Sequence, residues 1–146
     1  MDAQKIKTLL IRHEGLKFFP YKCSQGKLTI GIGRNIEDKG ITKEEALFML
    51  DTDIEQCEHD LAMLIFPEQF YLFPQNIQLV LVNMRFQLGH KGFKSFKKMI
   101  YAFQTADYQE AVVQMKDSKW AGQVPTRAKE LILMVEKEIH EKTTLR

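Results

Sequence analysis

The chain has 146 residues, 45% of them hydrophobic and 27% charged, which is typical of one globular domain that buries a core without disulfide bonds. The formal net charge of +2 gives no strong signal for nucleic-acid binding, and the two cysteines, Cys23 and Cys57, lack the spacing of a metal site. Residues 1–15 lack the apolar stretch of a signal peptide, and no stretch approaches the ~20 apolar residues of a membrane span. We therefore expect synthesis in the cytoplasm, no stable membrane insertion, and no cofactor or metal.

The first elements in chain order are a short helix and a β-hairpin. Asp2 is a typical N-cap residue, and the apolar spacing after it predicts a helix that ends near residues 13–15. Pro20 excludes a helix interior, and turn residues 24–26 separate two β-prone runs, so residues 18–33 are predicted to form a hairpin. Gly31 and Gly33 on the returning strand indicate that the backbone passes close to another element or to a ligand.

A long helix is predicted after a turn at residues 38–40. Thr42 and Glu45 form a capping box, and the helix should run to about Leu64, before Pro67. One face of this helix carries the apolar residues Leu47, Leu50, Ile54, Cys57, Leu61 and Leu64.

The remaining chain is predicted to be helical. Residues 75–88, with Pro74 at the first helical position and Gly89 after the end, are apolar almost all round and are expected to form the buried centre. Further helices are expected over residues 93–103, after the N-cap Asp107 with Glu110, and from residues 124–125 to about 142. The predicted fold class is α+β, mainly α, with a small hairpin lobe and a larger helical lobe.

Three residues around the hairpin are candidates for chemistry. Glu14 lies where the first helix ends, and a carboxyl at such a junction can act as a general acid in a cleft. Cys23, at the mouth of the hairpin, and Thr29, on the returning strand, can face it and position or activate a water. Taken alone, each residue is better explained structurally: Glu14 as a surface glutamate, Cys23 as an apolar strand cysteine and Thr29 as a threonine that favours strands.

Other polar and aromatic residues have similarly divided interpretations. Arg127 and Asn83 can pair with a cleft carboxylate or serve solvation and capping. Phe86 and Gln87 suit sugar binding, with a ring for the apolar face and an amide for hydroxyl groups, but they also suit packing. The same two interpretations apply to Trp120, for which a place in the core is favoured. The lysines at positions 91, 94, 97 and 98 fit a solvated helix face, which is compatible with attraction to an anionic polymer.

Three blocks of sequence together resemble the T-even phage-type lysozymes. The first comprises Glu14-Gly15-Leu16, Tyr21-Lys22, Gly26 and Thr29-Ile30-Gly31-Ile32-Gly33; the second is residues 83–89; the third is residues 118–128. They fall in the family's order and span most of the chain. The resemblance implies a muramidase, or endolysin, that hydrolyses the β-1,4 bond between N-acetylmuramic acid and N-acetylglucosamine in peptidoglycan. It also implies a lysozyme-like fold with a cleft between two lobes: residues 14–41, the connecting helix 42–64, and a helical lobe of 65–146 plus 1–13.

The resemblance assigns roles by position. Glu14 matches the general acid, Thr29 the threonine that places the attacking water, and Arg127 an arginine that pairs with the acid. Asn83 matches a polar neighbour. Residues matching the sugar groove are Phe86, Gln87 and Ser118, with Lys119 beside them.

Three departures from the family pattern stand out. Cys23 replaces the aspartate that is usual in the family. It either takes the aspartate's role, as a thiolate nucleophile or as a group that positions water, or indicates a damaged site. Direct attack by the sulfur implies retention of the anomeric configuration, and attack by water implies inversion. Only a short turn separates Gly33 from Thr42, where a longer β-region is usual. Arg34 replaces the usual histidine and is expected to find a carboxylate partner such as Asp53.

The sequence alone therefore leaves three functions open. A catalytically active wall-lysing enzyme is the first, a relative that only binds glycan is the second, and a nucleic-acid or partner-binding helical domain is the last, because it leaves the hairpin unexplained. A phage or prophage lysis enzyme would stay in the cytoplasm until a separate holin releases it to the periplasm; a bacterial autolysin or antibacterial effector is the alternative source. We expect a monomer.

Overall fold

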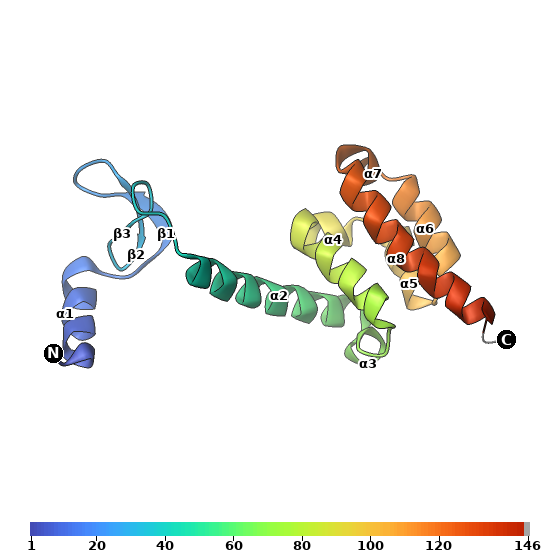
Figure 1. The fold of residues 1–146 in the computed structure, drawn as a ribbon, viewed down its shortest axis with the longest axis horizontal. Coiled ribbons are helices and arrows are strands. Elements are labelled where there is room, and N and C mark those ends of the chain that lie inside the picture. Colours follow the sequence, from blue (N-terminus) through green and yellow to red (C-terminus); the bar gives the residue numbers. More distant parts are fainter. Residues whose placement is uncertain (145–146) are drawn as a thin grey trace. The chain divides into compact units, whose positions relative to one another are not determined.

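The computed structural model describes residues 1–144, so the last two residues of the predicted 1–146 domain lie outside the described residues (Figure 1). Three short strands follow the first helix, and the remaining elements of the described chain are helices, which confirms the predicted α+β, mainly α class. In chain order the elements are α1 (Ala3–Glu14), β1 (Lys17–Lys22), β2 (Leu28–Gly31), β3 (Arg34–Asn35), α2 (Lys43–Ile65), α3 (Pro67–Phe70), α4 (Gln75–Lys94), α5 (Lys97–Gln104), α6 (Tyr108–Lys116), α7 (Lys119–Gln123) and α8 (Pro125–Thr144).

The chain forms two compact units, one up to Met49 and one from Leu50 onward. The boundary falls inside α2, and each unit is described by itself. The predicted division into residues 14–41, 42–64, and 65–146 with 1–13 stays a prediction.

The first unit begins with α1, whose start is fixed by its cap. The Oδ1 atom of Asp2 accepts hydrogen bonds from the backbone N–H groups of Gln4 and Lys5, both at 3.0 Å. The helix ends at Glu14, and Gly15 adopts a φ of 76° while its N–H donates to the carbonyl of Ile11. Because glycine adopts positive φ without a steric penalty, the chain turns sharply here and leaves Glu14 at the helix end.

The sheet of this unit has the antiparallel order β1-β2-β3. Tyr21 pairs with Thr29, and the register shifts between Lys17 and Tyr21, in the segment that contains Pro20. A proline lacks the N–H for a ladder bond, and β1 is an edge strand, which is where proline is tolerated. The predicted hairpin is therefore confirmed, whereas the two-residue strand β3 was not expected.

The start of α2 confirms the predicted capping box. The N–H of Glu45 donates to Oγ1 of Thr42 at 3.2 Å, and Oε2 of Glu45 accepts from the N–H of Thr42 at 2.8 Å. Toward its other end, α2 buries Cys57, Leu61, Ala62 and Ile65. Leu47 and Leu50, predicted on the same apolar face, are exposed.

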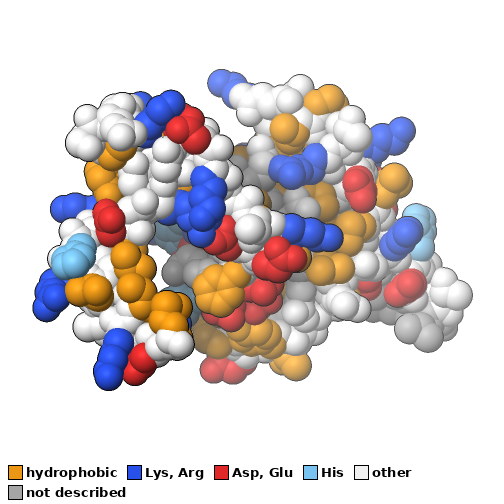
Figure 2. Space-filling model, turned by 60° about the vertical axis from the view of Figure 1, so that its left-hand side comes forward, with side chains coloured by type: hydrophobic (Ala, Val, Ile, Leu, Met, Phe, Trp, Pro, Cys, Tyr) orange, Lys and Arg blue, Asp and Glu red, His pale blue; other side chains and the backbone are white. Residues whose placement is uncertain are grey.

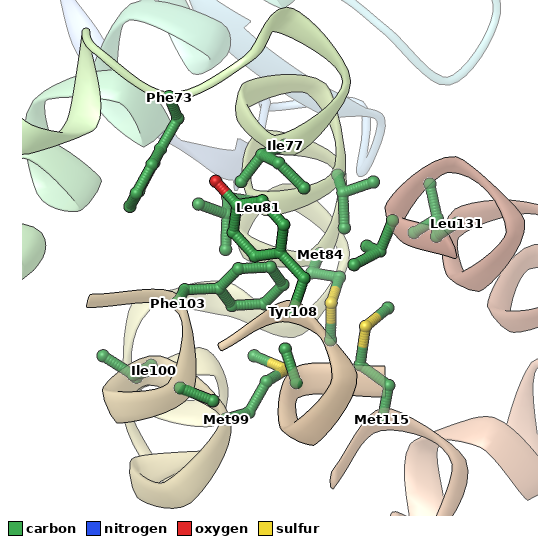
Figure 3. Packing of buried hydrophobic residues seen from close by; sticks show 14 of the residues in the cluster. Phe73, Ile77, Leu81, Met84, Met99, Ile100, Phe103, Tyr108, Met115 and Leu131 are labelled. Atoms are coloured by element: carbon green, nitrogen blue, oxygen red, sulfur yellow. The ribbon is translucent and has the colours of Figure 1, made fainter. Parts of the chain in front are cut away.

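The core of the second unit lies between α4, α5, α6 and α8 (Figure 3). Ile77 and Leu81 of α4 are fully buried, as is Phe103 of α5. Around them pack further apolar side chains of the same core, including Phe73, Met84, Met99, Ile100, Tyr108, Met115 and Leu131.

Two helix predictions in this unit were wrong. Residues 75–88 are not buried all round, because Leu79 is 50% and Phe86 45% exposed. The helix predicted over residues 93–103 is broken at Ser95 and Phe96: residues up to Lys94 belong to α4 and α5 begins at Lys97. Gly89, with a φ of 73°, ends the first part of α4 as predicted.

The predicted end of the long helix before Pro67 is confirmed, whereas the place of Pro74 differs from the prediction by one residue. The long helix α2 ends at Ile65 and Pro67 opens the short helix α3, while Pro74 is the N-cap of α4 rather than its first residue. None of the helices within residues 1–144 is long and apolar enough to cross a membrane.

Candidate functional site

The carboxylate of Glu14 lies directly against the backbone of Gly33. A Cβ atom built on Gly33 would be 2.8 Å from Oε2 and 3.0 Å from Cδ of Glu14. Gly33 follows β2 and has a φ of +67°. The turn between β2 and β3 therefore passes so close to the acid that a Cβ at position 33 would require the Glu14 carboxylate to shift. The neighbour that the glycine pattern indicated is thus another element, the end of α1.

Cys23 lies in the tight turn that joins β1 to β2. Its N–H donates to the carbonyl of Lys27 at 3.0 Å, and its own carbonyl accepts from Gly26 at 2.8 Å. Hydrogen bonds from the backbone of Gln25 and Lys27 lower the pKa of the Cys23 thiol, and the Thr29 hydroxyl acts in the same direction. The turn thus favours the thiolate, although the thiol is only partly buried.

Thr29 is 3% exposed, and its Oγ1 donates a hydrogen bond of 2.9 Å to the carbonyl of Lys27. A hydroxyl has one proton, so it serves either this carbonyl or the Cys23 sulfur at a given moment. The structure therefore brings together two of the three predicted hairpin residues, a thiol and a buried hydroxyl.

Glu37 is a supporting residue that the sequence analysis missed. Its carboxylate accepts from the N–H of Leu28 at 3.3 Å and lies 3.4 Å from Nζ of both Lys22 and Lys27. These partners, the Leu28 N–H first, lower the pKa of Glu37. The carboxylate thereby joins both ends of the turn that carries Cys23; a single glutamate in a loop gave no sequence signal of this role.

Arg34 forms a two-pronged ion pair with Glu45. Its Nη2 lies 2.6 Å from Oε1 and its Nη1 lies 3.1 Å from Oε2. The pair lowers the pKa of Glu45 to about 2, with the Arg34 hydrogen bond as the first cause. The expected partner Asp53 was therefore wrong. The Glu45 carboxylate pairs with Arg34 of β3 and also accepts the capping hydrogen bond from Thr42, so it connects β3 to the start of α2.

In the second unit, Gln87 is held by the tryptophan that the sequence analysis favoured as core. Trp120 is 2% exposed, and its Nε1 donates to Oε1 of Gln87 at 2.7 Å. Gln87 itself is exposed, and its neighbour Phe86 is 45% exposed. An amide and an aromatic ring thus lie on the surface at the end of the first part of α4, which is compatible with sugar binding.

The other predicted residues of this unit lie near helix starts or on exposed faces. Ser118 caps α7: its Oγ accepts from the N–H of Ala121 at 3.2 Å and donates to the carbonyl of Met115 at 2.7 Å. Lys119 begins α7 and is exposed, Arg127 lies in the first turn of α8, and Asn83 is an exposed residue of α4. Their contacts with substrate, and the pairing of Arg127 with Glu14, stay predictions.

Basic side chains do not gather into one patch on the face shown in Figure 2, where they alternate with acidic and apolar ones. The four lysines at positions 91, 94, 97 and 98 are exposed, as expected of a solvated helix face. Within residues 1–144 there is no group of three or more His, Cys, Asp or Glu side chains placed to hold a metal ion.

The phage lysozyme family model matches residues 11–131, which include the hairpin, the long helix and most of the helical unit. The chain belongs to the phage lysozyme family. Membership confirms the family resemblance and supports a lysozyme-like function, with peptidoglycan as the substrate of the family.

Relatives of this chain include proteins of Dictyostelium discoideum and of a bacteriophage. Probable T4-type lysozyme 2 of Dictyostelium discoideum is 27% identical over 162 aligned residues, which cover 92% of this chain and 95% of the relative. Probable T4-type lysozyme 1 of the same organism is 26% identical over 161 residues. The pre-baseplate central spike protein Gp5 of Enterobacteria phage T4 is 26% identical over 154 residues, covering 87% of this chain but 27% of Gp5.

Proposed function

We propose that this chain is a muramidase that hydrolyses the β-1,4 bond between N-acetylmuramic acid and N-acetylglucosamine in peptidoglycan. The observation that carries the proposal is the family match over residues 11–131, a range that contains Glu14 and Thr29. The contacts of the first unit supply a chemical reason why a cysteine at position 23 is compatible with activity.

Glu14 is proposed as the general acid. It donates its proton to the glycosidic oxygen as the bond to the anomeric carbon breaks. The close contact with Gly33 supports this role, because a backbone without a side chain allows the carboxylate to take up a defined place beside the β2–β3 turn. Arg127 is proposed to pair with this acid and Asn83 to act as its polar neighbour.

Cys23 is proposed to take the role of the family's aspartate in its ionised form, as a thiolate. The groups that lower its pKa first are backbone hydrogen bonds from Gln25 and Lys27, and backbone N–H groups are present whichever residue occupies position 23. The same turn would hold an aspartate carboxylate equally well. A thiolate in this place can therefore accept a proton from water, as a carboxylate does.

We propose that water, rather than sulfur, attacks the sugar. Thr29 holds the water, the water oxygen bonds to the anomeric carbon, and one water proton passes to the Cys23 sulfur. The hydroxyl of Thr29 beside the sulfur supports this assignment. NMR of freshly cleaved product tests it: the α-anomer formed first indicates inversion by water, whereas the β-anomer indicates retention through a sulfur–glycosyl intermediate.

The decisive experiment is clearing of chloroform-treated Gram-negative cells. Wild type should clear the suspension, Glu14→Gln should not, and Cys23→Ser should lose most of the activity, while the exposed Glu130→Gln serves as the matched control for loss of a carboxylate. Thermal unfolding of each variant checks that it is folded. No clearing by the folded wild type would favour the glycan-binding relative instead.

The variant Cys23→Asp tests the thiolate role directly. Wild-type activity should rise with pH as the thiol ionises, and Cys23→Asp should move this rise to more acidic pH, because a carboxyl ionises well below a thiol. Identical pH profiles of the two proteins would contradict participation of the Cys23 sulfur.

The biological setting is proposed from the resemblance to phage lysozymes. Cell lysis by a phage or prophage enzyme is favoured, with the chain acting as a monomer after a holin releases it from the cytoplasm to the periplasm. The substrate-groove residues are proposed to be Phe86, Gln87, Ser118 and Lys119, with Arg34 as a supporting residue that stabilises the β3–α2 junction.

A further inference from the structure

The carboxylate of Glu37 and the hydroxyl of Thr29 contact opposite ends of one peptide group, the one that joins Lys27 to Leu28. Its N–H, on Leu28, donates to Oε1 of Glu37 at 3.3 Å. Its carbonyl, on Lys27, accepts from Oγ1 of Thr29 at 2.9 Å and from the backbone N–H of Cys23 at 3.0 Å. One planar unit therefore connects a carboxylate with two of the residues proposed to carry the chemistry.

Glu37 is held in this place in its ionised form. The backbone N–H groups of Ile36 and Glu37 donate to the carbonyl of Leu28 at 2.9 and 3.3 Å, so the backbone here is fixed independently of the carboxylate. Nζ of Lys22 lies 3.4 Å from Oε1, and Nζ of Lys27 lies 3.4 Å from Oε2. The Leu28 N–H and these two ammonium groups lower the pKa of Glu37, which is therefore a carboxylate at neutral pH.

The charge on Glu37 affects the far end of the peptide group. Hydrogen bonds in a chain polarise one another, so a carboxylate that accepts from the N–H makes the carbonyl a stronger acceptor. The Thr29 hydroxyl has one proton and two acceptors within reach, this carbonyl and the Cys23 sulfur. A stronger carbonyl acceptor draws that proton toward the carbonyl and away from the sulfur.

We propose that Glu37 is a positioning residue that acts through the Lys27–Leu28 peptide group and directs the Thr29 hydroxyl proton toward the peptide carbonyl. This inference rests on the proposed muramidase function. With its proton directed to the carbonyl, the Thr29 oxygen presents its lone pairs to the attacking water and accepts a hydrogen bond from it. The other proton of the water passes to the Cys23 sulfur as the water oxygen bonds to the anomeric carbon. The glycosidic bond breaks, and its oxygen takes the proton of Glu14.

The substitution Glu37→Gln tests this role with little change of shape. It replaces the carboxylate with a neutral amide, whose oxygen is a weaker acceptor for the Leu28 N–H. The matched control is Asp38→Asn, which removes the same charge from the next residue. The Asp38 carboxylate also pairs with Nζ of Lys27, at 3.2 Å, but its other contact is the side-chain amide of Asn35.

The kinetic test is the release of reducing ends from purified peptidoglycan. Glu37→Gln should lower kcat about fivefold, in line with the weakening of one charge-assisted hydrogen bond, and should leave KM unchanged because the water and not the glycan is misplaced. Asp38→Asn should keep the wild-type kcat. In a Thr29→Val background, Glu37→Gln should cause no further loss, because the hydroxyl through which it acts is gone, whereas a Thr29→Ser background should retain the effect.

The ionisation of Cys23 gives a readout that a structural role of Glu37 would not produce. The pH dependence of iodoacetamide labelling measures the pKa of this thiol. Glu37→Gln should lower that pKa, because the Thr29 proton becomes available to the sulfur and stabilises the thiolate. The decrease should be much smaller in the Thr29→Val background. An equal decrease in both backgrounds would overturn the proposal, because Glu37 would then act as a negative charge alone.

An NMR titration of wild type tests the peptide connection without any variant. The amide proton shift of Leu28 and the carbonyl carbon shift of Lys27 should both follow the ionisation of Glu37, at a pH below the ordinary range of a glutamate. A Lys27 carbonyl shift that does not respond to this ionisation would overturn the proposal even if the variants failed to fold.

The outcomes separate this inference from the proposed function. If wild type does not hydrolyse peptidoglycan, the proposed function fails and this inference with it. If wild type hydrolyses peptidoglycan but Glu37→Gln, folded as judged by thermal unfolding, keeps the wild-type kcat or loses as much in the Thr29→Val background, the function stands and the positioning role of Glu37 is overturned.

Discussion

The substitution Gly33→Ala tests whether the contact between Gly33 and Glu14 matters for activity. The added methyl carbon would lie 2.8 Å from Oε2 and 3.2 Å from Cγ of Glu14. Non-bonded heavy atoms prefer separations of about 3.5–4.0 Å, so the carboxylate must move by roughly 1 Å. Gly31→Ala is the matched control, because Gly31 has a similar φ of +70° but nothing within 4 Å of its Cβ position.

Both variants place an alanine in an unfavourable backbone conformation, but only Gly33→Ala places a methyl group against Glu14. A non-glycine residue in the left-handed region costs about 1–2 kcal/mol, so both should unfold more easily by that amount. A displacement of about 1 Å at a catalytic group is enough to lower the rate about 100-fold. We therefore expect Gly33→Ala to lose about two orders of magnitude in kcat, and Gly31→Ala to stay within a few-fold of wild type.

The assay is the release of reducing ends from peptidoglycan, with urea unfolding to measure the shared loss of stability. Combining Gly33→Ala with Glu14→Gln supplies a further control, since a glycine that acts through Glu14 should have no additional effect once the acid is gone. Equal activities of the Gly33 and Gly31 variants would refute the reasoning, because strain alone would then account for both.

Three further predictions concern other groups of the fold. Iodoacetamide at neutral pH should label Cys23 well before Cys57, because the turn lowers the pKa of the first thiol while burial raises that of the second; equal labelling, measured by mass spectrometry of digests, would contradict this. Glu45→Gln should destabilise the protein at neutral pH, and the difference from wild type should shrink as pH falls from about 4.5 towards 2, because a depressed folded-state pKa stabilises only above that window; urea unfolding at several pH values checks it. Ile77→Ala, at a fully buried position, should lower the free energy of unfolding by about 2–5 kcal/mol, and a loss well under 1 kcal/mol in denaturant titrations would contradict the packing shown in Figure 3.

Local signals predicted local structure well. Asp2, the Thr42–Glu45 pair and Asp107 were assigned as caps from sequence, and each makes the expected hydrogen bond to a residue within three positions. Such bonds depend only on neighbours in the chain, so a single sequence contains what determines them.

Elements without a periodic pattern were missed. The helices α3 and α7 have four and five residues, and β3 has two, which is too short for any repeat of apolar residues to show. The break at Ser95 and Phe96 was missed for a related reason, because neither residue is a glycine or proline and the apolar spacing continues across it.

Partners that are distant in sequence could not be assigned from residue types. Arg34 needed a carboxylate, and several acidic residues of α2 were available; the capping box decided the choice, because it already holds the Glu45 carboxylate at the start of the helix. Trp120 illustrates the same limit. Its residue type predicted burial correctly but could not show that its one polar atom orients Gln87.

The alternating glycines Gly31 and Gly33 look equivalent in the sequence, but the structure gives them different reasons for being glycine. Gly31 and Gly33 give the same signal in the chain and have nearly the same positive φ, so both suit the backbone of the turn. Only Gly33 also needs the absence of a side chain for space, because the carboxylate of Glu14 occupies the place where a Cβ would lie. Backbone conformation therefore explains both glycines, and the position of the acid explains one. For this reason, a side chain at position 33 should lower both stability and activity, and a side chain at position 31 should lower stability alone.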